Sequence, residues 1–352
     1  ESLEALYRSQ ERWHDVAGVI ERRLGYAMTT AEAVELRIEL GRLFENQISD
    51  PEAAFESYAS ALAGDPSSAE ARTALERYLD EPALAVQAAN LLESVYVTTQ
   101  SWPKLVRIYE IKLDATSDPA ERLQITRYIA RLYEDQLEDM EGAFRWYGKV
   151  FREDPSDRAV RDQLVRLATI LESWERLAHV YQDYLDDEPG DRPELRDVAL
   201  EVARIYDYRL SEIDRGQAAY RRVLEGDPDN LPTFEALESM LTRGERWYAL
   251  CDCYEEAVHA TLDDARRQEL YIRLARVQET RLEDHNRAID AYQAVLNIDG
   301  EIAVAVESLY RLYKDQEQWN ELAELLRKQI ESADTPEGRN ENRAKLADVL
   351  EL

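Results

Sequence analysis

Residues 174–181 read WERLAHVY, and the same pattern returns as WYALCDCY at residues 247–254. A tryptophan opens five such segments, at intervals of 89, 72, 73 and 72 residues: Trp13, Trp102, Trp174, Trp247 and Trp319. Apolar residues follow each tryptophan at offsets of 3, 7 and 11, which trace one stripe along an α-helix. We therefore predict a tandem repeat in which each tryptophan begins the buried face of a helix.

Two further signatures keep the same register. The pentapeptide GRLFE at residues 41–45 aligns with residues 130–134, 203–207, 275–279 and 347–351. A later helix carries Tyr58, Tyr147, Tyr220 and Tyr292, and it is predicted to end at Asp-Pro pairs, because proline disfavours helix in the residue before it. A last helix leads to the next tryptophan. The cycle is therefore predicted to be four helices in about 72 residues, which gives about 20 helices in the chain.

These residues resemble the tetratricopeptide-repeat (TPR) superfamily. A small residue follows the Leu position in most cycles, as Ala17, Ala178, Cys251 and Ala323, and an Ala-x3-Tyr step appears at Ala54/Tyr58, Ala143/Tyr147 and Ala288/Tyr292. The resemblance covers essentially the whole chain. It implies an all-α fold, a right-handed α-α superhelix of the TPR-like solenoid type, with helix pairs of about 36 residues. The abundance of Arg over Lys adds a hint of a GC-rich bacterial source.

We predict a single continuous solenoid over residues 1–352, as a fragment of a longer array. Its cycles are expected at residues 1–66, 67–155, 156–228, 229–300 and, incomplete, 301–352. The first tryptophan interval is longer than the others, which predicts an extra inserted helix near residues 67–82. That helix would change the superhelical pitch locally or form a partner-specific edge.

The composition limits the partners. Asp and Glu number 73 against 43 Lys and Arg, for a net charge of −30. Such a surface repels nucleic acid and anionic membranes over a Debye length of roughly 8–10 Å, and it favours a protein or peptide partner of basic character. No apolar run is long enough to span a membrane. The cytoplasm is favoured, with the bacterial cell envelope as the alternative if a signal precedes residue 1.

No residue set predicts catalysis, a cofactor or a metal. Cys251 and Cys253 lie two residues apart, so on a helix their sulfurs point to nearly opposite sides, and both occupy apolar repeat positions. The four histidines match unrelated residues in the other cycles and lack the spacing of a helical zinc site. We therefore predict that the cysteines fill the core and that the protein is not an enzyme.

The tyrosines fall into two groups. Most continue the repeat framework of the five tryptophans: Tyr58, Tyr147, Tyr220, Tyr292, Tyr109, Tyr181 and Tyr254. The others are candidates for an exposed protein-binding surface: Tyr184, Tyr208, Tyr248, Tyr271 and Tyr310. Tyrosine suits such a surface because it combines a large contact area with a polar tip.

The sequence thus predicts a non-catalytic scaffold or adaptor that binds a peptide or protein segment on an acidic, tyrosine-containing concave face. Two alternatives stay open. The chain is the interaction or regulatory arm of a longer enzyme, or it is a self-assembling structural subunit. Because an uncapped solenoid end exposes a core-like face, end-to-end self-association is also expected.

Overall fold

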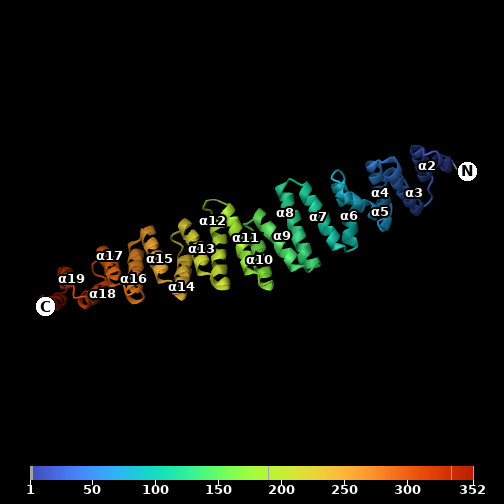
Figure 1. The fold of residues 1–352 in the computed structure, drawn as a ribbon. Helices are drawn as coiled ribbons and strands as arrows, with labels where there is room; N and C mark the ends of the chain where they lie inside the picture. The colour runs from blue at the N-terminus through green and yellow to red at the C-terminus, as the bar shows by residue number, and fades with distance from the viewer. Residues whose placement is uncertain (1–2, 189, 334, 352) are drawn as a thin grey trace. The chain divides into compact units, whose positions relative to one another are not determined.

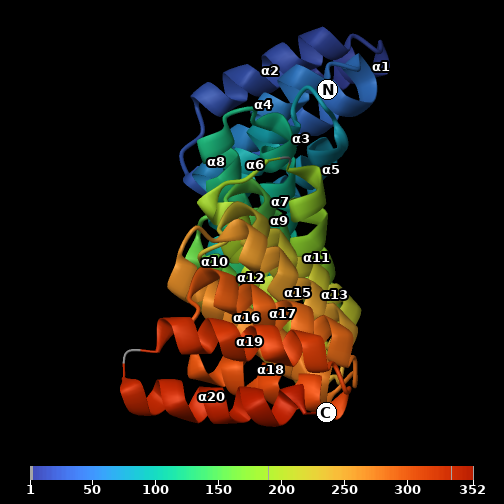
Figure 2. The same ribbon diagram turned by 90° about the vertical axis from the view of Figure 1, so that its left-hand side faces the viewer.

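The computed structural model describes residues 3–188, 190–333 and 335–351. Within these ranges it contains twenty α-helices and no β-strand, which confirms the predicted all-α solenoid class (Figure 1). Helices pack mainly on their neighbours in the chain, as in a stack of helical hairpins. Figure 2 shows this for the antiparallel α19 and α20.

The chain divides into two compact units, residues 1–173 and 174–352. The boundary falls immediately before Trp174, where one of the predicted cycles reaches its tryptophan. In the first unit the helices are α1 (Leu3–Ser9), α2 (Trp13–Gly25), α3 (Thr30–Leu43), α4 (Pro51–Gly64), α5 (Ala69–Arg77), α6 (Ala85–Thr98), α7 (Trp102–Ala115), α8 (Pro119–Arg131), α9 (Met140–Glu153) and α10 (Arg158–Ile170). In the second they are α11 (Trp174–Asp187), α12 (Pro193–Ile205), α13 (Ile213–Gly226), α14 (Leu231–Arg243), α15 (Trp247–Ala260), α16 (Asp264–Thr280), α17 (His285–Ile298), α18 (Ala303–Asp315), α19 (Trp319–Ser332) and α20 (Pro336–Leu350). Continuity of the solenoid across the boundary stays a prediction.

Short π-helical turns extend the helix that follows the tryptophan helix in three cycles. They follow α3, α8 and α12 directly, as η1 (Phe44–Ile48), η3 (Leu132–Gln136) and η4 (Tyr206–Leu210). Each turn begins inside the segment that aligns with GRLFE, so this signature marks the junction between α-helix and π-turn. A π-turn inserts one residue into the helical register and re-aims the side chains that follow.

The long first tryptophan interval contains two helices, α5 and α6, where the later cycles contain one. A short 3-10 turn, η2 (Tyr78–Asp80), ends α5. The Asp-Pro pairs lie close to the predicted helix ends: α4, α9 and α13 stop at the residue before the Asp. The proline itself lies in the turn, and the next helix begins three residues after it.

The tryptophans begin five helices, as predicted. α2, α7, α11, α15 and α19 all start at the tryptophan itself. The residue two positions earlier has a positive φ in every case: Glu11, Gln100, Glu172, Glu245 and Glu317. The next amide donates back into the preceding helix, for example Arg246 N to Leu241 O at 2.9 Å. This left-handed turn closes one helix and sets the direction of the tryptophan helix.

The left-handed turns predict a gain in stability on substitution by glycine. Glu245 has φ 54°, which costs an L-residue about 1–2 kcal/mol, whereas glycine tolerates it and loses about 0.5–1 kcal/mol of entropy instead. Glu245→Gly should therefore raise the free energy of unfolding by roughly 0.5–1 kcal/mol. Urea denaturation followed by circular dichroism measures it.

The matched control is Glu255→Gly, at an exposed position inside α15. It should lower the free energy of unfolding by about 1 kcal/mol, because glycine weakens a helix interior. A shift of the same sign in both variants would contradict the left-handed conformation of Glu245.

Candidate functional site: a repeated arginine, carboxylate and tyrosine cluster

A carboxylate at the end of one helix accepts a hydrogen bond from a buried tyrosine on the next, and this pair occurs in four cycles. Thirteen residues separate the two partners each time. Tyr58 donates to Glu45 at 2.9 Å and Tyr147 to Glu134 at 2.8 Å. In the second unit, Tyr220 donates to Asp207 at 3.4 Å and Tyr292 to Glu279 at 3.2 Å. The repeat tyrosines thus pack in the core and also position a carboxylate.

An arginine from the following helix completes each pair. Arg77 of α5 lies 2.9 Å from Glu45, and Arg311 of α18 lies 2.5 Å from Glu279. Arg166 pairs with Glu134 and Arg243 with Asp207 in the same way. Each carboxylate therefore links three successive helices. Where the acid is buried, as for Asp207, whose side chain is 2% exposed, loss of the arginine would leave a buried charge without compensation.

A second arginine begins each cluster. It is the Arg of the GRLFE signature, three residues before the carboxylate: Arg42, Arg131, Arg204 and Arg276. We call the resulting sets the first to fourth clusters: Arg42/Glu45/Tyr58/Arg77, Arg131/Glu134/Tyr147/Arg166, Arg204/Asp207/Tyr220/Arg243 and Arg276/Glu279/Tyr292/Arg311. All four signature arginines are exposed.

Burial dominates the electrostatics of these tyrosines. It raises the pKa of Tyr58 and Tyr147 well above its usual value, and the hydrogen bond to the neighbouring carboxylate raises it further. The pKa of Tyr220 and Tyr292 is raised as well, again chiefly by burial. The hydroxyls therefore stay protonated and act as hydrogen-bond donors, and none is poised as a base.

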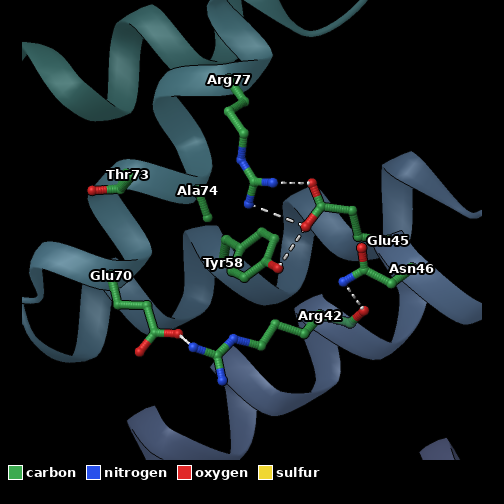
Figure 3. Close-up of a pocket in the computed structure, with 8 residues that line it drawn as sticks. All are labelled: Arg42, Glu45, Asn46, Tyr58, Glu70, Thr73, Ala74 and Arg77. Atoms are coloured by element: carbon green, nitrogen blue, oxygen red, sulfur yellow. Dashed lines mark hydrogen bonds and ion pairs between the residues drawn. The ribbon is translucent and has the colours of Figure 1, made fainter.

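The first cluster lines an open pocket of about 280 Å³ (Figure 3). Tyr58 and Arg77 both point at Glu45, and Arg42 reaches across to Glu70 on α5. Asn46 donates a hydrogen bond to the backbone oxygen of Arg42 at 2.9 Å. The pocket thus presents two guanidinium groups, and both are neutralised by acids of the chain itself.

Other tyrosines make similar contacts outside the clusters. Tyr109 and Tyr254, seven residues after their tryptophans, donate to Glu93 and Glu238 on the preceding helix. Lys112 lies 2.5 Å from Glu93, and Arg273 lies 2.8 Å from Glu238. Tying a buried tyrosine to an ion-paired acid is therefore a general device of this chain.

The framework residues predicted from the sequence lie where the helices meet. Tyr58, Tyr147, Tyr181, Tyr220, Tyr254 and Tyr292 are buried, and Tyr109 is half-buried. All five repeat tryptophans are half-buried. The guanidinium groups of Arg209 and Arg281 lie 4.5 and 4.8 Å from the ring centroids of Trp174 and Trp247. These tryptophans are therefore covered by cations as well as by apolar side chains.

The five candidate surface tyrosines lie in different environments. Tyr208 and Tyr248 are exposed, at 62% and 71%, and Tyr271 and Tyr310 are half-buried. The expectation for Tyr184 is wrong: it is 8% exposed and belongs to the core, because it lies on the buried stripe of α11 beside Leu185. Tyr208 lies beside the third cluster, since the Arg243 guanidinium is 5.3 Å from its ring centroid.

The cysteines lie in the core, as predicted. Cys251 and Cys253 are each 3% exposed, and burial raises the pKa of their thiols to about 11 and about 12. All four histidines are exposed. Over the described residues, no three His, Cys, Asp or Glu side chains are placed to hold a metal ion.

Sequence reasoning missed the clusters, although their spacing was readable. An arginine follows the repeat tyrosine by 19 residues at Arg77, Arg166 and Arg311. In the third cluster this position is Ser239, and Arg243, one helical turn later, takes the role and also donates to Ser239 at 3.1 Å. A search for charged residues in repeat register would have found three of the four.

Comparison with protein-family models and with curated proteins gives no match. Among solved structures, a crystal structure of MamA is 17% identical and matches 59% of this chain and 92% of its own, with a TM-score of 0.29. A tetratricopeptide repeat protein from Parabacteroides merdae ATCC 43184 is 15% identical over 79% of this chain and 98% of its own, with a TM-score of 0.23. The TPR2AB domain of yeast Sti1, in a complex with pHSP90, is 15% identical over 82% of this chain and 100% of its own, with a TM-score of 0.25. The assignment of this chain to the helical-repeat class rests on its own helices and register.

Proposed function

We propose that the protein is a non-catalytic scaffold that binds an extended segment of another protein along the helix face carrying the clusters. The observation that carries the proposal is the recurrence of one arrangement of charged groups at one repeat position. Within a unit, a segment that crosses two successive cycles meets the same chemistry twice. Repeated contacts raise the affinity of a segment even when each contact is weak.

The clusters suit binding because their charged groups are held in place. Each carboxylate is fixed by a tyrosine and by an arginine from two other helices, so little side-chain entropy is left to lose. Exposed Tyr208 adds contact area beside the third cluster. The tyrosine and the arginine of each pair thus fix the position of the carboxylate. The signature arginines lie in solvent, where a partner can reach them.

The net charge acts at longer range than the clusters. A charge of −30 draws partners of net basic character and speeds their association, as the sequence predicts. The roles of a regulatory enzyme arm and of a self-associating subunit stay predictions from the sequence. Within the described ranges, no helix combines the length and the apolarity needed to cross a bilayer.

Peptide selection tests the proposal directly. Peptides selected from a random phage-displayed library on the whole chain should compete with one another, and Arg204→Glu together with Arg276→Glu should weaken them at least about tenfold. The control is Arg145→Glu together with Arg327→Glu, which changes the charge equally at exposed positions outside the clusters. Selected peptides that bind both double variants equally well would refute binding at this face.

A further inference from the structure

Over the part of the chain that the structure describes, the first cluster has an acidic neighbour that the other three lack. Glu70, the second residue of α5, forms an ion pair with the signature arginine Arg42. α5 is the helix that follows Asp65-Pro66, and it belongs to the long first interval. Arg42 therefore has an acid supplied by its own chain.

The equivalent position carries no acid in the other three clusters. The second residues of α10, α14 and α18 are Ala159, Pro232 and Val304. They lie 12 residues after the cluster tyrosine, as Glu70 does, and all three are exposed. Among the described residues, no carboxylate lies within ion-pair distance of Arg131, Arg204 or Arg276. The signature arginine thus recurs in all four clusters, and within the described ranges only the arginine of the first cluster pairs with an acid.

The three arginines lie on the helices of their own cluster carboxylates. Arg131, Arg204 and Arg276 each precede the cluster acid by three residues, about one helical turn, and all three side chains are exposed. A guanidinium group carries five N–H donors in a planar arrangement. It therefore suits a carboxylate, which can accept two of these hydrogen bonds at once.

We propose that Asp or Glu side chains of the bound segment form ion pairs with Arg131, Arg204 and Arg276, as Glu70 does with Arg42. The proposal rests on the proposed function and names the contact made at its site. The partner is then a segment of net basic charge with acids at intervals. The negative electrostatic field of the whole chain attracts the basic segment. Once the segment is in contact, the exposed arginines bind its acidic side chains. An exposed ion pair contributes little alone, so the selectivity arises from two clusters acting on one segment.

Two matched peptides separate this contact from the overall field. One is a fluorescent repeat of Lys-Lys-Glu-Ser, and the other is Lys-Lys-Gln-Ser, in which every Glu is replaced. The field alone predicts tighter binding of the Gln peptide, because it is the more positive of the two. The proposal predicts that the Glu peptide binds the whole chain about fivefold to tenfold more tightly, measured by fluorescence anisotropy near physiological ionic strength.

Substitutions at the fourth cluster then identify the residues. Arg276→Gln removes the cation, and Val304→Glu supplies an acid at the position equivalent to Glu70. Each should cut the preference for the Glu peptide at least twofold, and Arg204→Gln combined with Arg276→Gln should abolish it in the second unit. Ala303→Glu and Arg327→Gln are the controls, since they make the same charge changes at exposed sites outside the cluster. These controls should leave the preference unchanged.

The outcomes distinguish the two proposals. Tighter binding of the Gln peptide, or equal effects of the cluster and control variants, would overturn the carboxylate contact while leaving a scaffold that binds basic segments. If neither peptide binds and the phage selection gives no binder sensitive to the clusters, both proposals fail. Because the substituted side chains are exposed, unchanged thermal unfolding of the variants should accompany either result.

Discussion

Raising the pH from 9 to 11 is expected to lower the free energy of unfolding of the first unit by up to about 5 kcal/mol. Burial raises the pKa of Tyr58, Tyr96, Tyr109 and Tyr147, and hydrogen bonds to neighbouring carboxylates add to it. The neutral hydroxyl is therefore favoured in the folded state. Its contribution is fully present below the unfolded pKa of about 10 and is lost above it, by about 1.4 kcal/mol per pH unit for each tyrosine.

Urea denaturation at a series of pH values, followed by circular dichroism, measures the slope. Tyr58→Phe removes one titrating group while keeping the ring, so it should reduce the dependence on pH by about one proton above pH 10. Tyr26→Phe is the control, because it makes the same substitution at a side chain that is 83% exposed. A free energy of unfolding that stays constant between pH 9 and 11 would contradict the burial of these hydroxyls.

Replacing Asp207 with alanine is expected to lower the free energy of unfolding of the second unit by about 2–4 kcal/mol. The Asp207 side chain is 2% exposed, accepts a hydrogen bond from Tyr220 and pairs with Arg243. Its loss leaves the hydroxyl of Tyr220, itself 0% exposed, without that acceptor. Arg243 is half-exposed and can turn to water, which keeps the loss below that of a fully buried pair.

Asp214→Ala provides the comparison. Asp214 also faces an arginine, Arg246 at 3.7 Å, but its side chain is 87% exposed. The expected loss is below about 0.5 kcal/mol, because solvent screens such a pair. Asp207→Asn should fall between the two, since it keeps an acceptor for Tyr220 and removes the charge. Equal denaturation midpoints for Asp207→Ala and Asp214→Ala would show that the third cluster does not stabilise the fold.

Much of the fold could be predicted because equivalent residues of a helical repeat recur at a constant spacing in the sequence. The buried stripe after Trp174 recurs after Trp247, and both tryptophans begin helices. The same register identified Cys251 and Cys253 as core residues, and they are buried. Apolar periodicity predicts these features well because burial against neighbouring helices acts on every copy in the same way.

Predictions for polar surface residues were less successful, for a physical reason. Tyr184 and Tyr208 were assigned to the same surface, yet one is buried and the other is exposed. Whether a given helix face is buried depends on which neighbouring helices pack against it at that point. Tyr208 lies inside the π-turn η4, where the side chains no longer follow the α-helical spacing of 3.6 residues per turn.

The repeat, the helix starts at the tryptophans and the core positions could all be predicted from the amino-acid sequence, since these features depend on local periodicity. The pairing of charged groups became visible only in the packed helices. Glu279, Tyr292 and Arg311 come from three helices, and their contacts exist only after these helices pack. Among the described residues, the packed helices also show that Arg42 has an acid partner whereas Arg276 has none, since Val304 stands in the fourth cluster where Glu70 stands in the first.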